Sequence, residues 1–248
     1  MRIEERQTQI LELLTAEPDL TVQELSSRLY VSEATVRRDF TELAARGLLR
    51  KVHGGAVVRE GAADREIPFL LRENERSAVK ARIGRQAADY IEDGMVLMLD
   101  GSTSAYHLVP YLSRFRDLLV VTSGAKTAVS LAEANIRTFC TGGQMMIHSF
   151  SYVGELAEAF VRHINADLFF FSCYGVSDTG QMTERMLEEA DLRRAMSSCS
   201  RKRILLLDSS KFGKTAFYNM GSIASIDAVV SDAPLPPHLA DLVGKDRG

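Results

Sequence analysis

Residues 21–58 read TVQELSSRLYVSEATVRRDFTELAARGLLRKVHGGAVV, and polar residues in this stretch mark two helix starts. Thr21 and Glu24 have the spacing of a capping box, in which the hydroxyl accepts a helix amide and the carboxylate accepts the amide of the capping residue. Ser32 can cap a second helix in the same way. Gly47 suits the end of that helix, because glycine readily adopts the left-handed C-terminal conformation. The stretch therefore predicts two short helices joined by a tight turn.

The apolar residues of both predicted helices recur at helical spacing, so each helix buries one face. These residues are Val22, Leu25 and Leu29 in the first helix and Val36, Phe40 and Leu43 in the second. The open face of the second helix carries Glu33, Ala34, Thr35, Arg37 and Arg38. Small polar side chains admit close approach to a DNA groove, and arginine bridges guanine edges or phosphates. The second helix is therefore predicted to read DNA.

Two short β-prone runs follow at 48–52 and 56–58, on either side of His53, Gly54 and Gly55. Glycine supplies the positive φ angles of a tight turn, so these runs predict a small hairpin whose basic strand lies beside the DNA backbone. An amphipathic stretch at 2–16 predicts a helix ahead of the two already described. The predicted DNA contacts of the resulting winged helix-turn-helix, residues 1–58, are Ser32, Glu33, Thr35, Arg37, Arg38, Arg50, Lys51 and His53.

Net charge does not by itself indicate nucleic-acid binding. The chain of 248 residues has a formal charge of -3, and its first 58 residues hold 8 Lys and Arg against 9 Asp and Glu. A protein that coats nucleic acid without specificity needs an excess of cations. Surface arginines are ordinarily just solvated, so the prediction of DNA contact depends on their place in the capped helix pair and its hairpin.

The cysteines and histidines predict no metal site and no cofactor. Cys140, Cys173 and Cys199 are widely spaced and form no C-x-x-C pair, which is typical of reduced cytosolic thiols. The five histidines show no zinc-binding spacing. No apolar run approaches the roughly 18 residues that span a bilayer, so the sequence predicts a cytoplasmic protein without a membrane segment.

A change in composition marks a second domain. Residues 59–72 are predicted to be a linker and residues 73–248 an α/β domain, whose first helix is expected at 73–92. Continuous apolar runs predict buried strands at 95–99, 118–122, 136–140, 168–172, 204–207 and 228–230. Helical segments are predicted between them at 105–112, 126–134, 153–163 and 187–198. This alternation predicts a Rossmann-like, largely parallel sheet with helices on both faces.

Small polar residues follow the predicted strands, at the edge where open parallel sheets bind ligands. They are Asp100, Gly101, Ser102, Thr103 and Ser104 after one strand, then Ser123, Gly142, Gly143 and Lys211 after others. Glycine lets the backbone approach an anion, and hydroxyls, a helix start and a lysine favour a phosphate. The turn at 101–103 also fits an ordinary helix cap, but the convergence of several polar loops favours a binding site.

The first domain resembles the N-terminal domain of the DeoR family of bacterial transcriptional regulators. The resemblance is carried by the segments ILELL at 10–14, VSEATVRRDF at 31–40, Gly47, Leu48 and VHGGA at 52–56. It continues through LDGST at 99–103, EEA at 188–190, RAM at 194–196 and DSSKFG at 208–213. The resemblance implies a winged helix-turn-helix joined to a sensor domain related to ribose-5-phosphate isomerase, which typically binds a phosphorylated sugar or derivative.

Two positions depart from that family pattern. Ser123 stands where the family commonly has asparagine, and Tyr174 stands in a segment that usually reads Gly-Ala-Asp-Gly. Tyr174 is predicted to cap the ligand pocket. These departures remove an amide and a carboxylate and add a phenol, so the effector of a relative need not be the effector of this chain.

The rival hypothesis is an active sugar-phosphate isomerase or deaminase fused to a DNA-binding domain. Isomerisation needs a carboxylate base beside the substrate carbon, but the resemblance aligns that base with Arg193. Glu188, Glu189 and Asp191 are interpreted as charges favoured by a helix N-terminus. A domain that only oligomerises is a third alternative. The prediction is a repressor that binds operator DNA as a homo-oligomer, a dimer or tetramer, and responds to a phosphorylated metabolite without catalysis.

Overall fold

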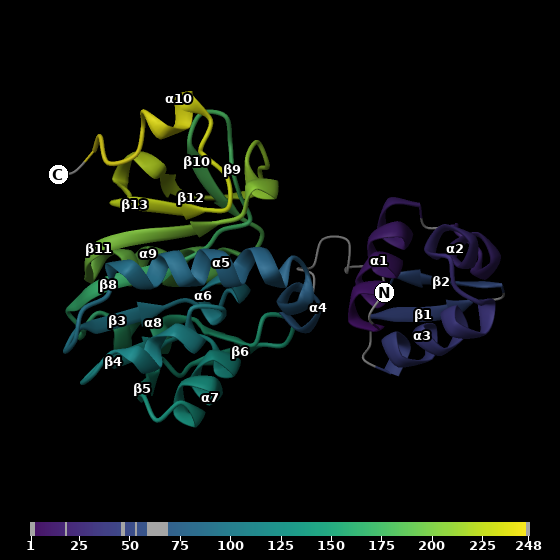
Figure 1. Cartoon of the computed structure of the whole chain (residues 1–248), viewed down its shortest axis with the longest axis horizontal. Helices are drawn as coiled ribbons and strands as arrows, with labels where there is room; N and C mark the ends of the chain where they lie inside the picture. The colour runs from purple at the N-terminus through teal and green to yellow at the C-terminus, as the bar shows by residue number, and fades with distance from the viewer. Residues whose placement is uncertain (1–2, 18, 46–47, 53, 59–68, 247–248) are drawn as a thin grey trace. The chain divides into compact units, whose positions relative to one another are not determined.

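The computed structural model describes residues 3–17, 19–45, 48–52, 54–58 and 69–246, and they form two compact units, Met1–Glu75 and Arg76–Gly248 (Figure 1). Most of the predicted linker, residues 59–68, and also Gly47 and His53 lie outside the described residues. The last part of the predicted linker is helical, in α4 (Phe69–Asn74). No helix within the described ranges has the length and apolar composition that a bilayer crossing requires.

The N-terminal unit has the predicted three helices and hairpin, with α1 (Ile3–Ala16), α2 (Val22–Leu29), α3 (Glu33–Ala45), β1 (Leu49–Val52) and β2 (Gly55–Val58). The capping box is formed: the Glu24 amide donates to the Thr21 hydroxyl at 3.2 Å, and the Thr21 amide donates to the Glu24 carboxylate at 2.8 Å. The two strands are antiparallel, and Gly54 takes a φ of 81° in their turn. The predicted apolar stripes of α2 and α3 are buried together in one core.

The C-terminal unit is built on a six-stranded parallel sheet, as the apolar runs predict. Its order is β13-β11-β8-β3-β4-β5. The strands are β3 (Val96–Leu99), β4 (Leu119–Thr122), β5 (Arg137–Cys140), β8 (Ala166–Phe171), β11 (Ser200–Leu207) and β13 (Ala228–Ser231). Because all six run in one direction, their carboxyl ends meet at one edge.

Helices cover both faces of this sheet (Figure 1). One face packs on α5 (Ser77–Ala87), α6 (Thr103–Tyr106), α7 (Ala125–Glu133) and the 3-10 helices η1 (Ala88–Tyr90) and η2 (Val109–Arg114). The other packs on α8 (Glu155–Val161) and α9 (Leu187–Ser198). Neighbouring residues such as Phe169 and Phe170 alternate between the two cores, and both are fully buried. Burial on both faces explains the continuous apolar runs.

Two predicted helices differ in extent. The helix predicted at 73–92 is confirmed from Ser77 to Ala87, in α5, and η1 follows it, but the left-handed φ of 51° at Arg76 separates this helix from α4. The guanidinium of Arg76 forms ion pairs with Asp208 and Asp232, each at 3.3 Å. These two carboxylates directly follow the last residues of β11 and β13. The helix predicted at 105–112 is divided into α6 and η2, and η2 has Pro110 in its first turn.

Two small sheets were not predicted. β6 (Gln144–Met146) and β7 (Ser151–Val153) form a hairpin, and β9 (Gly175–Val176), β10 (Gln181–Glu184) and β12 (Tyr218–Ser222) form an antiparallel sheet. The short helices η3 (Ser209–Lys211), η4 (Ile223–Ser225) and α10 (Pro237–Ala240) complete the unit. The β6–β7 hairpin meets the main sheet at its ligand edge, since Tyr152 donates its amide to the Ser123 carbonyl at 2.7 Å.

Candidate DNA interface and ligand site

The open face of α3 presents the polar residues that the sequence predicts to read DNA. Glu33 and Arg37 form an ion pair at 3.1 Å, and both side chains are exposed. Ser32 caps the helix, because its hydroxyl accepts the Thr35 amide at 3.2 Å. Arg38 is exposed and makes no ion pair with a described residue. The charge of Arg37 is thus partly offset, while that of Arg38 is not.

The hairpin is tied to the same helix. Lys51 donates from Nζ to the Thr41 hydroxyl of α3 at 2.6 Å, and Arg50 beside it is exposed. This bond holds the basic strand against α3, so both elements present one surface. Buried Asp39 on the inner side of α3 accepts two hydrogen bonds from Arg6 of α1, at 2.6 and 3.0 Å.

Tyr30 is a candidate that the sequence prediction missed. It ends α2 in a left-handed conformation, with a φ of 54°, and 94% of the residue is exposed. An aromatic side chain in solvent at the turn before a recognition helix can donate its hydroxyl to a DNA phosphate. The left-handed backbone conformation of Tyr30 turns its side chain into solvent, and no sequence pattern predicts that conformation.

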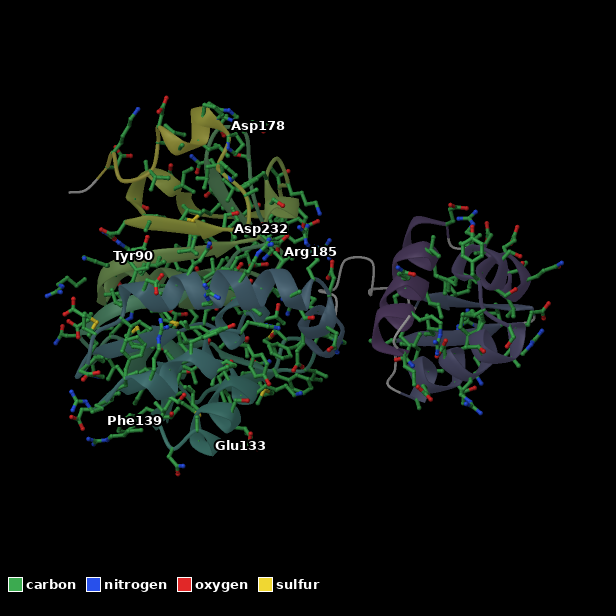
Figure 2. All side chains as sticks on the ribbon, in the orientation of Figure 1. Tyr90, Glu133, Phe139, Asp178, Arg185 and Asp232 are labelled. Carbon is green, nitrogen blue, oxygen red and sulfur yellow. The ribbon has the colours of Figure 1, made fainter. Side chains whose placement is uncertain are left out.

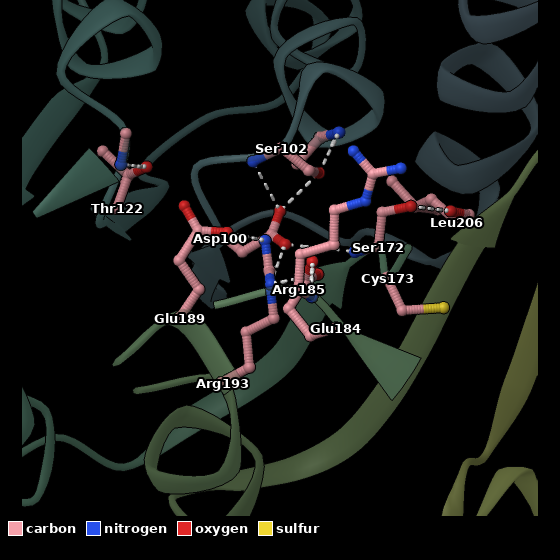
Figure 3. Close-up of polar contacts among 12 residues, drawn as sticks. Asp100, Ser102, Thr122, Ser172, Cys173, Glu184, Arg185, Glu189, Arg193 and Leu206 are labelled. Atoms are coloured by element: carbon pink, nitrogen blue, oxygen red, sulfur yellow. Dashed lines mark hydrogen bonds and ion pairs between the residues drawn. The ribbon is translucent and has the colours of Figure 1, made fainter. Parts of the chain in front are cut away.

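In the C-terminal unit, a buried cluster joins the strand ends. Arg193 of α9 contacts Asp100 after β3 at 2.8 Å, Glu184 of β10 at 2.7 Å and Glu189 of α9 at 3.3 Å (Figure 3). None of these four side chains is more than 6% exposed. Burial alone lowers the pKa of Arg193, but the three carboxylates raise it well above its ordinary value. Glu189 lies in the first turn of α9, as the sequence predicts, and it is also a buried ion partner of this cluster.

Asp100 also shapes the loop that begins α6. One of its oxygens accepts the Ser102 amide at 3.1 Å and the Ser102 hydroxyl, and the other accepts the Ser172 amide at 3.1 Å. The Ser102 hydroxyl in turn caps α6 by accepting the Ala105 amide at 3.1 Å. Ser102 therefore orders the loop, while the amides of Thr103 and Ser104, at the first two helix positions, have no partner within the helix.

Gly101 is fixed by close approach of the β6–β7 hairpin. A Cβ atom at Gly101 would lie 1.8 Å from the Ser151 hydroxyl and 2.9 Å from the Ser151 Cβ, so any other residue there requires Ser151 to shift. The bridge between Gly124 and Ser151 brings the hairpin to this loop. Gly142 and Gly143 have φ angles of 66° and 101°, and no hydrogen bond among the described residues links them to the Arg193 cluster.

Lys211 lies in η3, directly after β11, and its side chain reaches the segment that follows β8. Its Nζ donates to the Ser172 hydroxyl at 2.9 Å and to the Cys173 carbonyl at 2.7 Å. The Cys173 thiol is fully buried, and burial raises its pKa to about 12 although Lys211 acts in the opposite direction. Within the described residues, no carboxylate lies within ion-pair distance of the Lys211 ammonium group.

Arg185, which directly follows β10, is the second residue that the sequence prediction missed. Its guanidinium donates to the Tyr174 hydroxyl at 3.0 Å and lies 4.3 Å from the centroid of the Tyr174 ring. Tyr174 therefore lies at the predicted site, but it supports an arginine there. The only sequence signal for Arg185 is its position after a short polar strand, which resembles many surface loops.

The linked loops carry two accessible cations, while Glu188 in the first turn of α9 is an exposed anion nearby in the sequence. Arg185 and Lys211 are half-buried, whereas Asp100, Glu184 and Glu189 are buried. At the neighbouring strand end, burial alone would raise the pKa of Asp208, but Lys211, the Ser210 hydroxyl and Arg76 hold it below its usual range. Arg185 and Lys211 are thus more accessible to solvent than the three carboxylates that bind Arg193. Figure 2 labels Arg185 and Asp232 at this edge.

The structure also has a groove of about 370 Å³ between η2 and α7, lined by residues that include Tyr106, His107 and Ser130. None of the predicted effector-binding residues lines it. Within the described chain, no three His, Cys, Asp or Glu side chains are grouped so that they could hold a metal ion.

Comparison with known proteins assigns both units. The sequence pattern of one protein family, the DeoR C-terminal sensor domain, matches residues 75–233. The pattern of a second, the DeoR-like helix-turn-helix domain, matches residues 6–61. The chain belongs to the DeoR family of transcriptional regulators. The uncharacterized HTH-type transcriptional regulator YulB of Bacillus subtilis is 33% identical, over 96% of this chain and 92% of that protein. The glycerol-3-phosphate regulon repressor of Escherichia coli is 31% identical, over 95% of this chain and 93% of that protein.

Among solved structures, the ribose 5-phosphate isomerase of Plasmodium falciparum has a TM-score of 0.42 at 13% identity, with 56% of this chain and 53% of that chain covered. Membership of the DeoR family makes this chain a DNA-binding regulator with a small-molecule sensor domain, and not an enzyme. Arg193, near which the sequence analysis places the base of the rival enzyme hypothesis, is a buried cation that forms ion pairs with three carboxylates.

Proposed function

We propose that this DeoR-family regulator is a repressor of a carbohydrate operon, and that a phosphorylated sugar or a related metabolite modulates its operator binding. The observation that carries the proposal is the difference in burial at the strand ends, where Lys211 and Arg185 are half-buried and the carboxylates of Asp100, Glu184 and Glu189 are buried. Such a surface attracts an anion. The E. coli relative that is named as repressor of the glycerol-3-phosphate regulon supports the sign of regulation and the phosphorylated ligand.

The phosphate site is proposed to involve residues from several strand ends. They are Asp100, Gly101, Ser102, Thr103, Ser104, Ser123, Gly142, Gly143, Tyr174 and Lys211. Within this set, Asp100 and Ser102 order the loop, and the amides of Thr103 and Ser104 together with Lys211 donate to the ligand. This division follows from their hydrogen bonds, because the Ser102 hydroxyl already donates to Asp100.

The operator site is proposed to use Ser32, Glu33, Thr35, Arg37, Arg38, Arg50 and Lys51, with Tyr30 added and with His53 kept as a prediction. One head offers few cations, so strong binding needs two or more heads on one duplex. We therefore propose a homo-oligomer, a dimer or tetramer, that acts in the cytoplasm.

The test measures operator binding by fluorescence anisotropy, with DNA from upstream of the protein's own gene and a panel of phosphorylated sugars. We expect at least one compound to change the operator affinity of the wild-type chain, and Lys211→Gln to weaken that response about tenfold or more, because a charged hydrogen bond is removed. Lys202→Gln is the matched control, since Lys202 is exposed near the opposite end of the same strand β11. A panel without effect on the wild-type chain, or an equal response in both variants, would overturn the proposal.

A further inference from the structure

Arg185 is a cation that the side chain of Tyr174 holds in place. Its guanidinium stacks on the Tyr174 ring at 4.3 Å and donates to the Tyr174 hydroxyl at 3.0 Å. Among the described residues, no carboxylate lies within ion-pair distance of that guanidinium. A guanidinium has five N–H donors in a rigid fork, so most of its donors stay available for a ligand.

The Tyr174 side chain fixes this arginine without neutralising it. A carboxylate at the same position would form an ion pair with Arg185 and compete with any anionic ligand. The phenol supplies an aromatic face and an acceptor oxygen but no charge. Tyr174 is therefore suited to hold the fork in one orientation while leaving its charge for another group.

Arg185 and Lys211 lie on either side of one short segment. Lys211 binds the Ser172 hydroxyl and the Cys173 carbonyl, and Arg185 binds the next residue, Tyr174. The Ser172 amide shares the Asp100 carboxylate with the loop that begins α6. Figure 3 draws Arg185 in the same close-up as Asp100 and Ser102. Two separate cations thus border the proposed phosphate site.

We infer that Arg185 binds a second anionic group of the effector. The effector is then a phosphorylated sugar acid or a sugar bisphosphate, and not a sugar that carries a single phosphate. The inference rests on the proposed function, because it assumes that the strand ends bind a phosphorylated ligand. Lys211 and the loop amides hold one phosphate, and the planar fork of Arg185 holds a carboxylate or second phosphate in bidentate fashion.

The experiment uses calorimetry on the full chain with pairs of C3 to C6 compounds that differ by one acidic group. Glucose 6-phosphate with 6-phosphogluconate separates a carboxylate from an aldehyde, and fructose 6-phosphate with fructose 1,6-bisphosphate tests a second phosphate. We expect one doubly anionic compound to bind roughly tenfold or more tightly than its partner, and Arg185→Gln to remove that preference. Binding of the singly phosphorylated partner should change less than about threefold in the same variant.

Three further variants separate the ligand role from a structural one. Arg185→Lys keeps the charge and should retain part of the preference, while Tyr174→Phe keeps the ring and should lose less than Arg185→Gln. Arg162→Gln is the matched control, because Arg162 forms an exposed ion pair with Glu158 on α8 and should leave the preference unchanged. The unliganded melting temperature of each variant checks that it folds.

The outcomes distinguish this inference from the proposed function. If wild-type protein binds both members of every pair equally, or if Arg185→Gln weakens both members equally, the second anion site is wrong and the phosphate site stands. If no phosphorylated compound binds, the proposed function fails as well.

Discussion

Arg193 joins three carboxylates from different elements at the strand ends of the C-terminal unit. Its guanidinium is the shared partner of Asp100, Glu184 and Glu189, and all four side chains are buried. A buried ion pair adds little net stability when it is complete, but removal of one partner leaves a charge in a site without water. Arg193 therefore acts mainly by offsetting the cost of burying three carboxylates.

The residue-scale prediction is that Arg193→Met lowers the free energy of unfolding by about 3–5 kcal/mol, the usual cost of an uncompensated buried charge. Urea denaturation followed by circular dichroism measures the change. Arg194→Met is the matched control, because Arg194 is on the same helix but 46% exposed, and it should change stability by no more than about 0.5 kcal/mol. Similar decreases in both variants would show that the cluster does not carry this role.

The cysteines should differ in reactivity, because the thiolate is the nucleophile. Burial raises the pKa of Cys173 to about 12, and Cys140 is exposed. Iodoacetamide at pH 8 should therefore modify Cys140 and spare Cys173 in the folded protein, and mass spectrometry should find both modified in urea. The raised pKa of the Cys173 thiol also makes stability depend on pH. Between pH 9 and 12 the thiol ionises in the unfolded chain but stays protonated in the folded one, so the free energy of unfolding is unaffected below pH 9 and decreases as the pH rises toward 12. Rapid labelling of folded Cys173 would contradict its burial.

At the scale of elements, local signals predict more than long-range ones. The capping box of α2 and the six continuous apolar strands follow from neighbouring residues, and the structure confirms them. β10 and β12 were missed because their residues, QMTE and YNMGS, have no strong apolar pattern. Their strand character comes from pairing with each other across some 35 residues.

In the candidate ligand site, too, local sequence signals predict some residues and long-range packing determines others. A polar loop after a buried strand is visible in sequence, which is why Asp100 and Lys211 were predicted. The pairing of Arg193 with Glu184 or of Arg185 with Tyr174 depends on how β10 and α9 pack, and no spacing rule encodes it. The sequence alone therefore predicts the edge of the sheet where ligands bind, but not which charges are buried there and which are accessible.

The prediction at this scale concerns the start of α2. Thr21→Ala removes the hydroxyl that accepts the Glu24 amide, and the loss of such a cap costs about 1 kcal/mol of unfolding free energy. Ser27→Ala is the control, because its exposed hydroxyl bonds only to the Gln23 carbonyl within the same helix, and alanine is the better helix former. Urea denaturation should find Ser27→Ala at or above wild-type stability. Equal destabilisation by the two substitutions would mean that the capping box does not stabilise the unit.

For the whole molecule, DNA and effector are proposed to bind different units, so regulation requires a coupling free energy between them. An effector changes operator affinity only if it binds the DNA-competent and DNA-incompetent arrangements unequally. Reciprocity then requires operator DNA to change the effector affinity by the same factor. In the proposed oligomer a modest coupling is sufficient, because each DNA-binding unit is nearly neutral and several units share the operator.

The salt dependence of operator binding measures how many DNA phosphates each head neutralises. Each neutralised phosphate releases counterions, so the slope of log K against log salt becomes shallower by about 0.9 for each phosphate that a variant no longer binds. Arg50→Ala removes an exposed cation of β1, and in a dimer the slope should become shallower by about 2, one for each head. Arg116→Ala is the control, because Arg116 is 85% exposed and pairs with Asp93 in the C-terminal unit, so it should leave the slope unchanged. An unchanged slope for Arg50→Ala would mean that Arg50 neutralises no DNA phosphate, which would contradict the proposed place of the β1 strand beside the DNA backbone.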